Sequence, residues 1–332
     1  MKIVVKRKLP VNYDERDKVF FEREFVKGIE EPSSLTIRNA IITSQGIVYA
    51  NFKVVEASLV SGLTNGIGTM HLIAQIIKKK KLKWNGPKPP AVVFDYWYRG
   101  YFHWMTETLP RILYLKKLGA DFVPVVPRDG AAPFIEKTLL PFNFASLGWI
   151  KPSEYLHART VLLVKHTAPT GNYNEGLIRE LRTLFRTYYD AANATCPVDK
   201  IYISRLRASR RRVINDEAVS NLLRDYGFVT LHFEDYTFEK QVHLAANASM
   251  LISIHGAGLT NMLFMKPKAS VLEFRPQNDD TNLCYYALAS ALDLNYFYQF
   301  GEPGQKEHGI NDDVMVGLPK LRENVERMLS QR

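Results

Sequence analysis

Apolar residues in the second half of the chain recur as short buried-strand runs separated by amphipathic stretches. Strands are expected at 201–203, 229–231, 250–254, 271–274 and 296–300. The stretches between them predict helices at 215–227, 237–248, 259–265 and 282–292. Strands and helices that alternate over short loops predict a parallel sheet with helices on both faces, which is an α/β fold.

The first half has a less regular pattern and begins with a β-rich segment. Alternation over residues 41–60 predicts a hairpin around Gln45-Gly46. A helix is expected over 70–84, and buried strands are expected at 91–94 and 122–126. No internal repeat is present in the sequence.

The length and the apolar content indicate two domains. A chain of 332 residues with 46% apolar residues is long for one core and normal for two. We expect an N-terminal half at 1–160, a C-terminal half at 161–317, and a C-terminal helix at 318–332 that is able to pack back on the N-terminal half.

The net charge of +10 favours anionic partners. The lysine run Lys78–Lys83, followed by Trp84, offers a surface for anionic lipid headgroups, or is only the solvated end of a helix. The chain shows no signal-peptide pattern and no run near the ~18 apolar residues of a membrane span. We therefore expect a cytoplasmic location, with peripheral attachment to the inner face of the membrane as an extension of it.

The run Ser253–Asn261, Ser-Ile-His-Gly-Ala-Gly-Leu-Thr-Asn, follows a strand and precedes a helix. Glycines let the backbone approach a ligand, and a helix start offers free N–H groups to an anion. A phosphate site with His255 at its mouth is the leading interpretation. The alternative is a tight turn with an incidental histidine, because the third glycine of a dinucleotide fingerprint is missing.

Two further polar groups follow strands in the same half. Ser204 and Arg205 come directly after the strand 201–203 and start a loop that contains five arginines, including Arg210. Glu273 lies near the end of a later strand. Carboxyl ends of parallel strands meet at one edge of a sheet, so these residues are expected to converge on the His-Gly turn. Exposed basic loops and simple ion pairs are the alternatives.

An imidazole and a carboxylate four residues apart, His103 and Glu107, share a face if this segment is helical. A carboxylate beside an imidazole can orient it as a general base. A core helix with a satisfied histidine is the alternative, and Pro110 predicts a kink. Asp95 is a reserve candidate. Two cysteines without metal spacing and no Asp-x-Asp motif give no metal site.

Several of these segments together resemble glycosyltransferase family 61. The resemblance covers roughly residues 90–290 in the expected order and rests on these runs: His103-Trp104 to Leu109-Pro110-Arg111, Tyr202-Ile203-Ser204-Arg205, Arg212-Val213-Ile214-Asn215, Phe238 to Ala248, Ile254 to Phe264, and Val271-Leu272-Glu273. Bacterial members often have Asp at the position of Glu107. Animal members carry signal anchors, which this chain lacks, so it is more similar to the bacterial enzymes of envelope polysaccharide synthesis.

The resemblance implies a GT-B architecture, with two Rossmann-like halves that face a cleft, and an inverting transfer from a nucleoside-diphosphate sugar without a required metal or other cofactor. The uridine-linked donor would bind in the C-terminal half, at these positions: Ser204, Arg205, Arg210, His255, Gly256, Ala257, Gly258, Leu259, Thr260, Asn261 and Glu273. Arg205 and the turn would hold the diphosphate, and Glu273 would lie near the ribose. His103, Glu107 or Asp95 would supply the base from the other half.

The expected partners are therefore a nucleotide sugar and a saccharide acceptor, either free or lipid-linked, and no nucleic acid. Three other classes stay open. A basic RNA-binding protein would explain the charge, but no RNP or KH signature accompanies the arginines. A nicotinamide oxidoreductase should carry a full Gly-x-Gly-x-x-Gly. A non-catalytic nucleotide-binding relative would keep the fold and lose the reaction.

Overall fold

The computed structural model describes residues 2–60, 69–119, 121–191, 198–277, 279, 282–304 and 309–331. The chain forms two compact units. Unit 1 comprises Met1–Ile3 and Ile29–Leu177, and unit 2 comprises Val4–Gly28 and Ile178–Arg332. Among the described residues, none of the helices combines the length and the apolar character that crossing a membrane requires.

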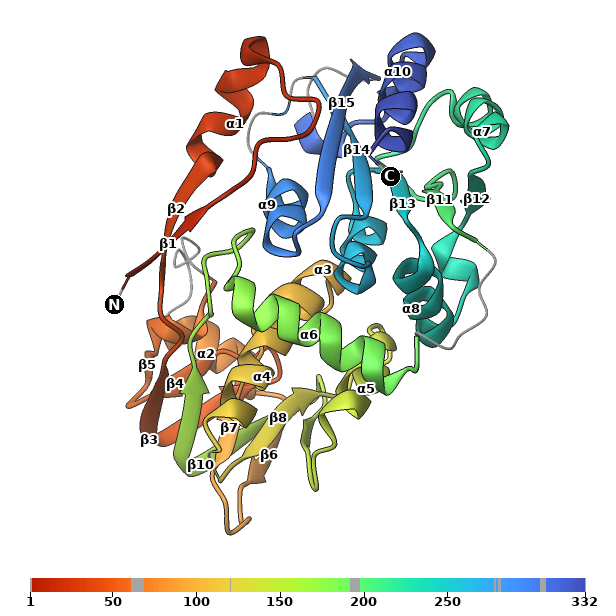
Figure 1. Ribbon diagram of the computed structural model, residues 1–332. Helices are drawn as coiled ribbons and strands as arrows, with labels where there is room; N and C mark the ends of the chain where they lie inside the picture. The colour runs from red at the N-terminus through yellow and green to blue at the C-terminus, as the bar shows by residue number, and fades with distance from the viewer. Residues whose placement is uncertain are drawn as a thin grey trace. The chain divides into compact units, whose positions relative to one another are not determined.

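Unit 2 contains the predicted parallel sheet, with strands in the order β12-β11-β13-β14-β15-β16 (Figure 1). The first five strands are parallel, and β16 is antiparallel to β15. Their bounds are β11 Lys200–Ile203, β12 Val229–Leu231, β13 Met250–Ile254, β14 Ser270–Pro276, β15 Asn295–Pro303 and β16 Val314–Met315. The α/β expectation for this half is confirmed.

Helices alternate with these strands. Their bounds are α6 Glu175–Tyr188, α7 Asp216–Asp225, η5 Phe233–Asp235, α8 Phe238–Asn247, η6 Ala257–Phe264, α9 Cys284–Ala291, η7 Gly309–Asn311 and α10 Leu318–Leu329. Apolar side chains of α7 and α10 share one core with the sheet residues Tyr202, Ile252 and Leu272. We expected 318–332 to be able to pack back on the N-terminal half. Helix α10 places Leu321, Val325 and Met328 in this core of unit 2. Within 1–160, it contacts Val11 and Asn12.

Local signals explain two helix boundaries and fail at a third. Thr237 caps α8 through its side chain, which accepts a hydrogen bond from the backbone of Lys240. Gly227 follows α7 with a φ of +80°, where glycine avoids strain. Asn215 occupies the predicted N-cap position of α7, but its side chain makes no capping bond, because its amide pairs with the backbone of Val316 at 2.8 and 3.0 Å instead.

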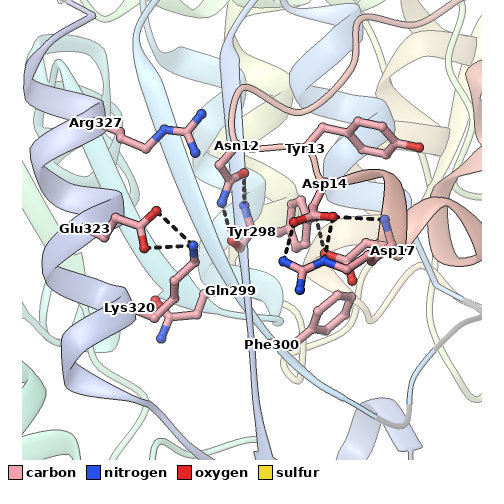
Figure 2. Close-up of a pocket in the computed structure, with 11 residues that line it drawn as sticks. Asn12, Tyr13, Asp14, Asp17, Tyr298, Gln299, Phe300, Lys320, Glu323 and Arg327 are labelled. Carbon is pink, nitrogen blue, oxygen red and sulfur yellow. Dashed lines mark hydrogen bonds and ion pairs between the residues drawn. The ribbon is translucent and has the colours of Figure 1, made fainter.

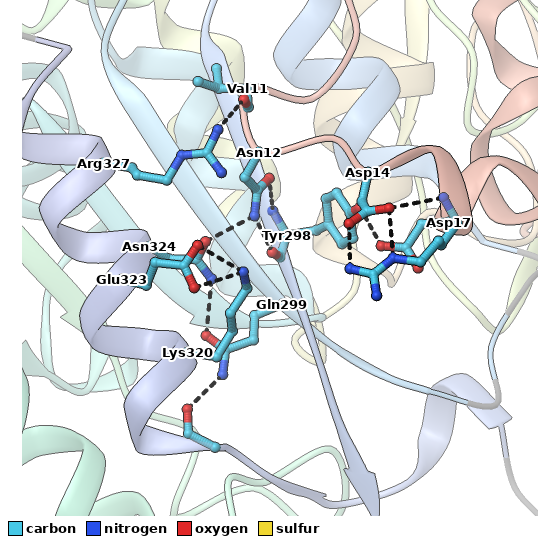
Figure 3. A network of polar contacts seen from close by, with 12 residues as sticks. Val11, Asn12, Asp14, Asp17, Tyr298, Gln299, Lys320, Glu323, Asn324 and Arg327 are labelled. Carbon is cyan, nitrogen blue, oxygen red and sulfur yellow. Dashed lines mark hydrogen bonds and ion pairs between the residues drawn. The ribbon is translucent and has the colours of Figure 1, made fainter.

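The first residues of the chain complete unit 2. The segment contains η1 (Glu15–Asp17) and α1 (Lys18–Phe25), and β1 (Lys2–Lys6) pairs with β2 (Val26–Glu30). Asn12 donates to the carbonyl of Tyr298 at 2.7 Å and to Asn324 Oδ1 at 3.0 Å (Figure 3). Phe21 is fully buried against Tyr298. The N-terminal segment is therefore held to β15 and α10 by both polar and aromatic contacts.

Unit 1 is built on an eight-stranded mixed sheet of order β5-β4-β3-β10-β7-β8-β9, with β6 also paired to β10. Its strands are β3 Ser34–Thr43, β4 Val48–Ala50, β5 Lys53–Val54, β6 Lys80–Lys83, β7 Pro90–Val92, β8 Val123–Pro127, β9 Gly148–Ile150 and β10 Glu154–Val164. Its helical segments are η2 Glu56–Ser58, α2 Thr69–Ile76, α3 Tyr101–His103, η3 Trp104–Thr108, α4 Leu109–Lys117, α5 Phe134–Leu139 and η4 Leu140–Phe142.

The sheet of unit 1 joins an antiparallel part to a parallel part. Strands β3, β4 and β5 are antiparallel neighbours, whereas β10, β7, β8 and β9 run parallel. The predicted hairpin is confirmed, since Ile42 pairs with Val48 across a turn in which Gly46 has a φ of +78°. The predicted β-rich start thus corresponds to the antiparallel part.

The predicted helix over 70–84 is wrong in its second half. Helix α2 ends at Ile76, and Lys80–Lys83 form β6, which runs parallel to β10 from Glu154 to His157. Lysine side chains tolerate an exposed strand, and pairing to a long neighbour supplies the backbone hydrogen bonds that a helix would have supplied.

Strand β10 also bears on the expected domain division. We expected a boundary between residues 160 and 161, but β10 continues through Val164, and the two units divide between Leu177 and Ile178. The assignment of an acceptor half and a donor half to the chain stays a prediction.

Candidate functional site

The predicted convergence of strand ends in unit 2 is present in the structure. β11, β13 and β14 are neighbours, and Arg205 after β11 packs on Gly256 after β13. A Cβ atom at Gly256 would lie 2.8 Å from Arg205 Cζ, so only glycine leaves room for the guanidinium. Arg205 is fixed by hydrogen bonds to the carbonyls of Arg211 at 3.2 Å and Arg210 at 3.4 Å.

Arg211 is a second cation at this strand edge, and the sequence did not single it out. Its Nε is buried and has no hydrogen-bond partner within the described part of the chain, and its backbone φ is +57°. Burial lowers the pKa of both Arg205 and Arg211, and repulsion from Arg205 and Arg210 lowers that of Arg211 further. A bound anion would relieve both the desolvation and the repulsion.

The other arginines of the loop have different environments. Arg207 pairs with Asp235 at 2.6 Å, and Arg212 pairs with Asp313 at 2.6 Å. Arg210 is exposed, and its described contact is the one through its backbone carbonyl to Arg205. Of the side chains in this loop, Arg205 and Arg211 are therefore the best placed for an anion, rather than Arg205 and Arg210 as the sequence suggested.

Ser204 does not fit the predicted contact with a donor. Its side chain is buried and hydrogen-bonded to both carboxylate oxygens of Asp216 at 3.0 Å. Its Oγ also accepts from the backbone N–H of Leu206 at 3.2 Å. Ser204 fixes the start of the arginine loop and leaves the anion to Arg205.

His255 and Glu273 form a buried pair behind the turn. His255 Nδ1 lies 2.5 Å from Glu273 Oε1, and Tyr296 donates to Glu273 Oε2 at 2.6 Å. Arg275 contacts Oε1 at 3.3 Å and pairs with Asp279 at 2.6 Å. The predicted contact of Glu273 with a ribose does not fit a carboxylate with no exposed surface, because both of its oxygens are already bonded. Its contacts instead orient His255.

Opposing effects fix the charges of this pair. Burial lowers the pKa of His255, although Glu273 opposes the shift, so the imidazole is held neutral. Burial alone would raise the pKa of Glu273, but Arg275 and His255 outweigh it and hold that pKa below its usual value of 4.5. The pair is thus a neutral imidazole on an ionised carboxylate, which leaves the other ring nitrogen of His255 to contact a ligand.

Replacing Glu273 by glutamine is expected to destabilise unit 2 by about 3 kcal/mol, because it leaves Arg275 buried without its full charge balance. A carboxyl with a lowered pKa stabilises the fold above its unfolded value and loses that contribution as the pH falls through the folded value. In the wild type, the protection of amides against hydrogen exchange should therefore decrease as the pH is lowered below about 4.5. The variant should show a smaller decrease.

Hydrogen exchange of the β13 and β14 amides measures this effect within unit 2. Tryptophan fluorescence would report only on unit 1, because the four tryptophans all lie in that unit. The variant Glu234→Gln, at an exposed carboxylate of unit 2, is the control. Equal protection in wild type and Glu273→Gln would contradict the role given to Glu273.

Replacing Gly256 by alanine is expected to weaken nucleotide binding about tenfold while the melting temperature changes by less than about 2 °C. The new Cβ displaces the flexible end of Arg205 rather than any backbone atom, so the fold survives. Calorimetric titration with uridine diphosphate measures the affinity. Gly317→Ala, at a position with no atom within 4 Å of the new Cβ, should keep wild-type affinity.

The rest of the His-Gly-Ala-Gly run is less accessible than predicted. The segment after Gly256 is the 3₁₀ helix η6 rather than an α-helix, and Leu259, Thr260 and Asn261 are buried within it. Ala257 is exposed, and Gly258 packs against Ile203, 3.1 Å from where its Cβ would be. Because Gly256 is buried too, backbone at 257–258 remains the accessible part of the turn.

The candidate base in unit 1 lies on an unusual helix. Leu109 N–H bonds the carbonyl of Trp104, five residues earlier, so Trp104–Thr108 form a π-turn between α3 and α4. The kink predicted at Pro110 is replaced by this wider turn, which accommodates a residue without an N–H in the next turn. His103 Nδ1 still meets Glu107 Oε1 at 3.1 Å, as the spacing predicted.

The two side chains differ in exposure. The His103 side chain is 27% exposed, whereas that of Glu107 is 3% exposed. Glu107 Oε2 is buried and has no hydrogen-bond partner in the described segments. A buried, unpaired carboxylate oxygen is costly and calls for a functional reason. His103 is the member of the pair that can reach a ligand.

Asp95 is bound more tightly than a reserve base should be. It pairs with Arg111 at 2.6 Å, and His166 Nε2 lies 3.2 Å from the same oxygen. Burial alone would raise the pKa of Asp95, but Arg111 and His166 hold it well below its usual range. An ionised, ion-paired carboxylate is a weak proton acceptor at neutral pH. We therefore place His103 and Glu107 ahead of Asp95.

Asp95, Glu107 and His166 are also able to hold a metal ion, because one ligand atom from each lies within 4.8 Å of the others. We expected no metal from the sequence. Arg111 already neutralises Asp95, which weakens this set as a cation site.

Sequence reasoning missed Arg111 and His166 in unit 1. His166 has a detectable signal: β10 and β7 are parallel neighbours, and Asp95 and His166 each follow the carboxyl end of one of them. The expectation that residues at the carboxyl ends of parallel strands meet would have found His166 if it had been applied to unit 1. Arg111 stood in the recognised Leu-Pro-Arg segment, but nothing local gave it a partner.

The pocket drawn in Figure 2 contains none of the predicted site residues. It has a volume of about 400 Å³ and lies among the N-terminal segment, β15 and α10 of unit 2. Its charges are engaged locally, since Arg16 pairs with Asp14 at 2.6 Å and Lys320 with Glu323 at 2.9 Å. The same network holds the N-terminal segment in place.

A parallel α/β sheet with a glycine turn and two arginines at its strand ends is an arrangement that suits a phosphate-bearing ligand, and it defines an α/β protein with a candidate anion site. The chain belongs to the glycosyltransferase 61 family, whose family model matches residues 101–272, just over half of its length. The matched segment includes the His103–Glu107 pair and the turn at Gly256.

Curated relatives support the same family. The chain is 34% identical over 127 residues to protein O-linked-mannose β-1,4-N-acetylglucosaminyltransferase 2 of Mus musculus, which covers 36% of this chain and 22% of the relative. The Homo sapiens protein gives the same values. The EGF domain-specific O-linked N-acetylglucosamine transferase of Canis lupus familiaris is 29% identical over 91 residues, 26% of this chain and 17% of the relative. The matches thus span about a fifth of these relatives.

Proposed function

We propose that this protein is an inverting glycosyltransferase that moves a sugar from a nucleoside-diphosphate sugar to a saccharide acceptor. One observation carries the proposal: in a member of family 61, Arg205 and Arg211 are partly buried at a strand edge, and neither forms an ion pair with a carboxylate among the described residues. Glu234 opposes the lowering of the Arg205 pKa only in part. Desolvated cations of this kind need an anion. A diphosphate supplies the negative charge that two arginines and a glycine turn are able to bind.

The proposed reaction is a direct displacement. The acceptor hydroxyl attacks the anomeric carbon, its proton passes to His103 Nε2, and the bond from that carbon to the diphosphate oxygen breaks. Glu107 holds His103 through Nδ1. Arg205 and Arg211 stabilise the charge that develops on the leaving diphosphate, so we propose that no metal or other cofactor is required.

The finer features of the proposal follow the resemblance. They are a GT-B architecture with the donor in the C-terminal half, a uridine-linked donor, a free or lipid-linked saccharide acceptor, and a role in surface polysaccharide synthesis in the cytoplasm, as in bacterial members. The relatives described above are animal proteins, so bacterial character rests on the sequence resemblance alone. Their names mention N-acetylglucosamine transfer, which makes that sugar the first donor to test.

A thermal-shift screen over nucleotide sugars, with and without chelator, tests the proposal. A ligand that binds only the folded state raises the melting temperature, by an amount that corresponds to about 2.7 kcal/mol at 100 times its dissociation constant. We expect uridine-diphosphate sugars, beginning with the N-acetylglucosamine form, to stabilise the protein equally with and without chelator. A chelator-sensitive shift would point to Asp95, Glu107 and His166 as a metal site, and stabilisation by nicotinamide cofactors alone would overturn the proposal.

A further inference from the structure

Helix α2 carries a second apolar face that the core does not use. Leu72 is 1% exposed and packs with Tyr49 and Ile76 on the inner side of the helix. On the outer side, Met70 is 77% exposed and Ile77, in the turn that follows α2, is 70% exposed. A helix on a protein surface normally presents polar residues to water.

These outer residues form one continuous stripe. Met70, Ile73, Ala74 and Ile77 are spaced by three, four and seven positions, which places them on one side of a helix. Ile73 is 41% exposed and Ala74 is also exposed. The backbone N–H of Ile77 bonds the carbonyl of Ile73 at 2.9 Å, so the helical turn continues through the last member of the stripe.

Exposed lysines follow the stripe directly. Lys78, Lys80, Lys81 and Lys83 are all exposed, and the last three lie on β6, the element that follows α2 in the chain. Alternation along the strand turns Lys81 and Lys83 to one face and Lys80 to the other. Lys79 is different: it bonds Gln75 at 2.9 Å, and burial lowers its pKa. The surface therefore pairs an apolar stripe with a cationic border.

We propose that α2 and β6 form a docking surface for a bilayer that contains anionic lipid. The apolar side chains would enter the boundary between headgroups and acyl chains, and the lysines would meet lipid phosphates. A symmetric contact with a second copy would oppose lysine to lysine, and nucleic acid would leave the apolar stripe in water. A bilayer that contains anionic lipid can both bury the apolar stripe and bind the lysines. This docking does not require the proposed sugar transfer.

Vesicle flotation of the full chain tests the surface. Wild-type protein is expected to float with vesicles of phosphatidylcholine containing about one third phosphatidylglycerol, and not with phosphatidylcholine alone. The double variant Met70→Gln/Ile77→Gln should weaken binding about tenfold or more, because two side chains lose their apolar burial. Replacing Lys81 and Lys83, which share one face of β6, by glutamine should weaken it about fivefold per lysine and reduce its salt sensitivity.

Leu118→Gln is the matched control, since Leu118 is a 51% exposed apolar residue elsewhere in unit 1. It should float like wild type. All of these side chains are exposed, so the variants are expected to fold, and circular dichroism checks this.

Three outcomes would overturn the inference. They are wild-type protein that ignores anionic vesicles at low salt, an equal loss of flotation in the Leu118 control, and a wild-type dimer that the Met70/Ile77 variant dissociates without any change in flotation. Arg205→Ala should still float, which separates failure of membrane docking from failure of the proposed transfer.

Discussion

Replacing Arg205 by alanine is expected to weaken binding of uridine diphosphate about 100-fold or more, because it removes a charge-assisted, two-pronged contact to phosphate from a water-poor site. The guanidinium is already fixed over Gly256 by two loop carbonyls, so little ordering is needed on binding. Calorimetric titration measures the affinity, and thermal unfolding verifies the fold. Arg211→Ala is expected to lose affinity in the same direction.

Arg212→Ala is the matched control from the same loop. Arg212 is exposed and forms a two-pronged pair with Asp313 at 2.6 and 2.9 Å, so its removal changes the net charge by the same amount without touching the proposed anion site. Its affinity should stay within about threefold of wild type. A general electrostatic effect would weaken both variants alike, and unchanged affinity in Arg205→Ala would remove this residue from the donor site.

Replacing His103 by alanine is expected to lower kcat by about 10²–10⁴-fold while the affinity for donor stays close to wild type. The imidazole is the exposed member of the His103–Glu107 pair, and a lost general base affects the chemical step rather than nucleotide binding. Added imidazole should restore part of the rate, since it can occupy the space left by the side chain. Glu107→Gln should reduce kcat less than His103→Ala does, because Glu107 only positions the imidazole.

His157→Ala serves as the control, because His157 is a half-buried histidine on β10 of the same unit with no place in the proposed reaction. A kcat for Glu107→Gln as low as that of His103→Ala, without rescue by imidazole in the latter, would identify Glu107 as the base. An equal loss of donor affinity in His103→Ala would argue for a binding role.

The fold of unit 2 was largely predictable from its sequence because each signal there is local. Apolar runs mark strands that are buried on both faces, and Thr237 and Gly227 mark helix ends. The lysine run in unit 1 was assigned to a helix because lysine is compatible with either structure. Only pairing with β10, whose partner residues lie about seventy positions away, makes Lys80–Lys83 a strand.

The site was predictable as a location but not as a set of roles. Parallel strands bring Arg205, His255 and Glu273 together, and the structure confirms that meeting. Register then decides what each does: Glu273 pairs with Ser253 inside the sheet, three residues before the end of β14, and is buried away from solvent. No sequence pattern distinguishes the exposed Arg210 from the partly buried Arg211, because a left-handed backbone at Arg211 makes the difference.

The N-terminal segment has a consequence for how the molecule is made. Val4–Gly28 leaves the ribosome before the rest of unit 2, yet Asn12 in this segment contacts Tyr298 and Asn324, which lie 286 and 312 positions further along the chain. Unit 1 can close as soon as its own residues have emerged, whereas unit 2 must wait until β15 and α10 have emerged. During that interval Phe21 has Tyr13 beside it but lacks two other aromatic partners, Tyr286 and Tyr298. A chain cut before Ile178 would lack the part of unit 2 that Val4–Gly28 contacts, and a chain begun after Gly28 would lack Val4–Gly28 itself. Unit 2 therefore depends on two segments far apart in the chain and is less independent than unit 1.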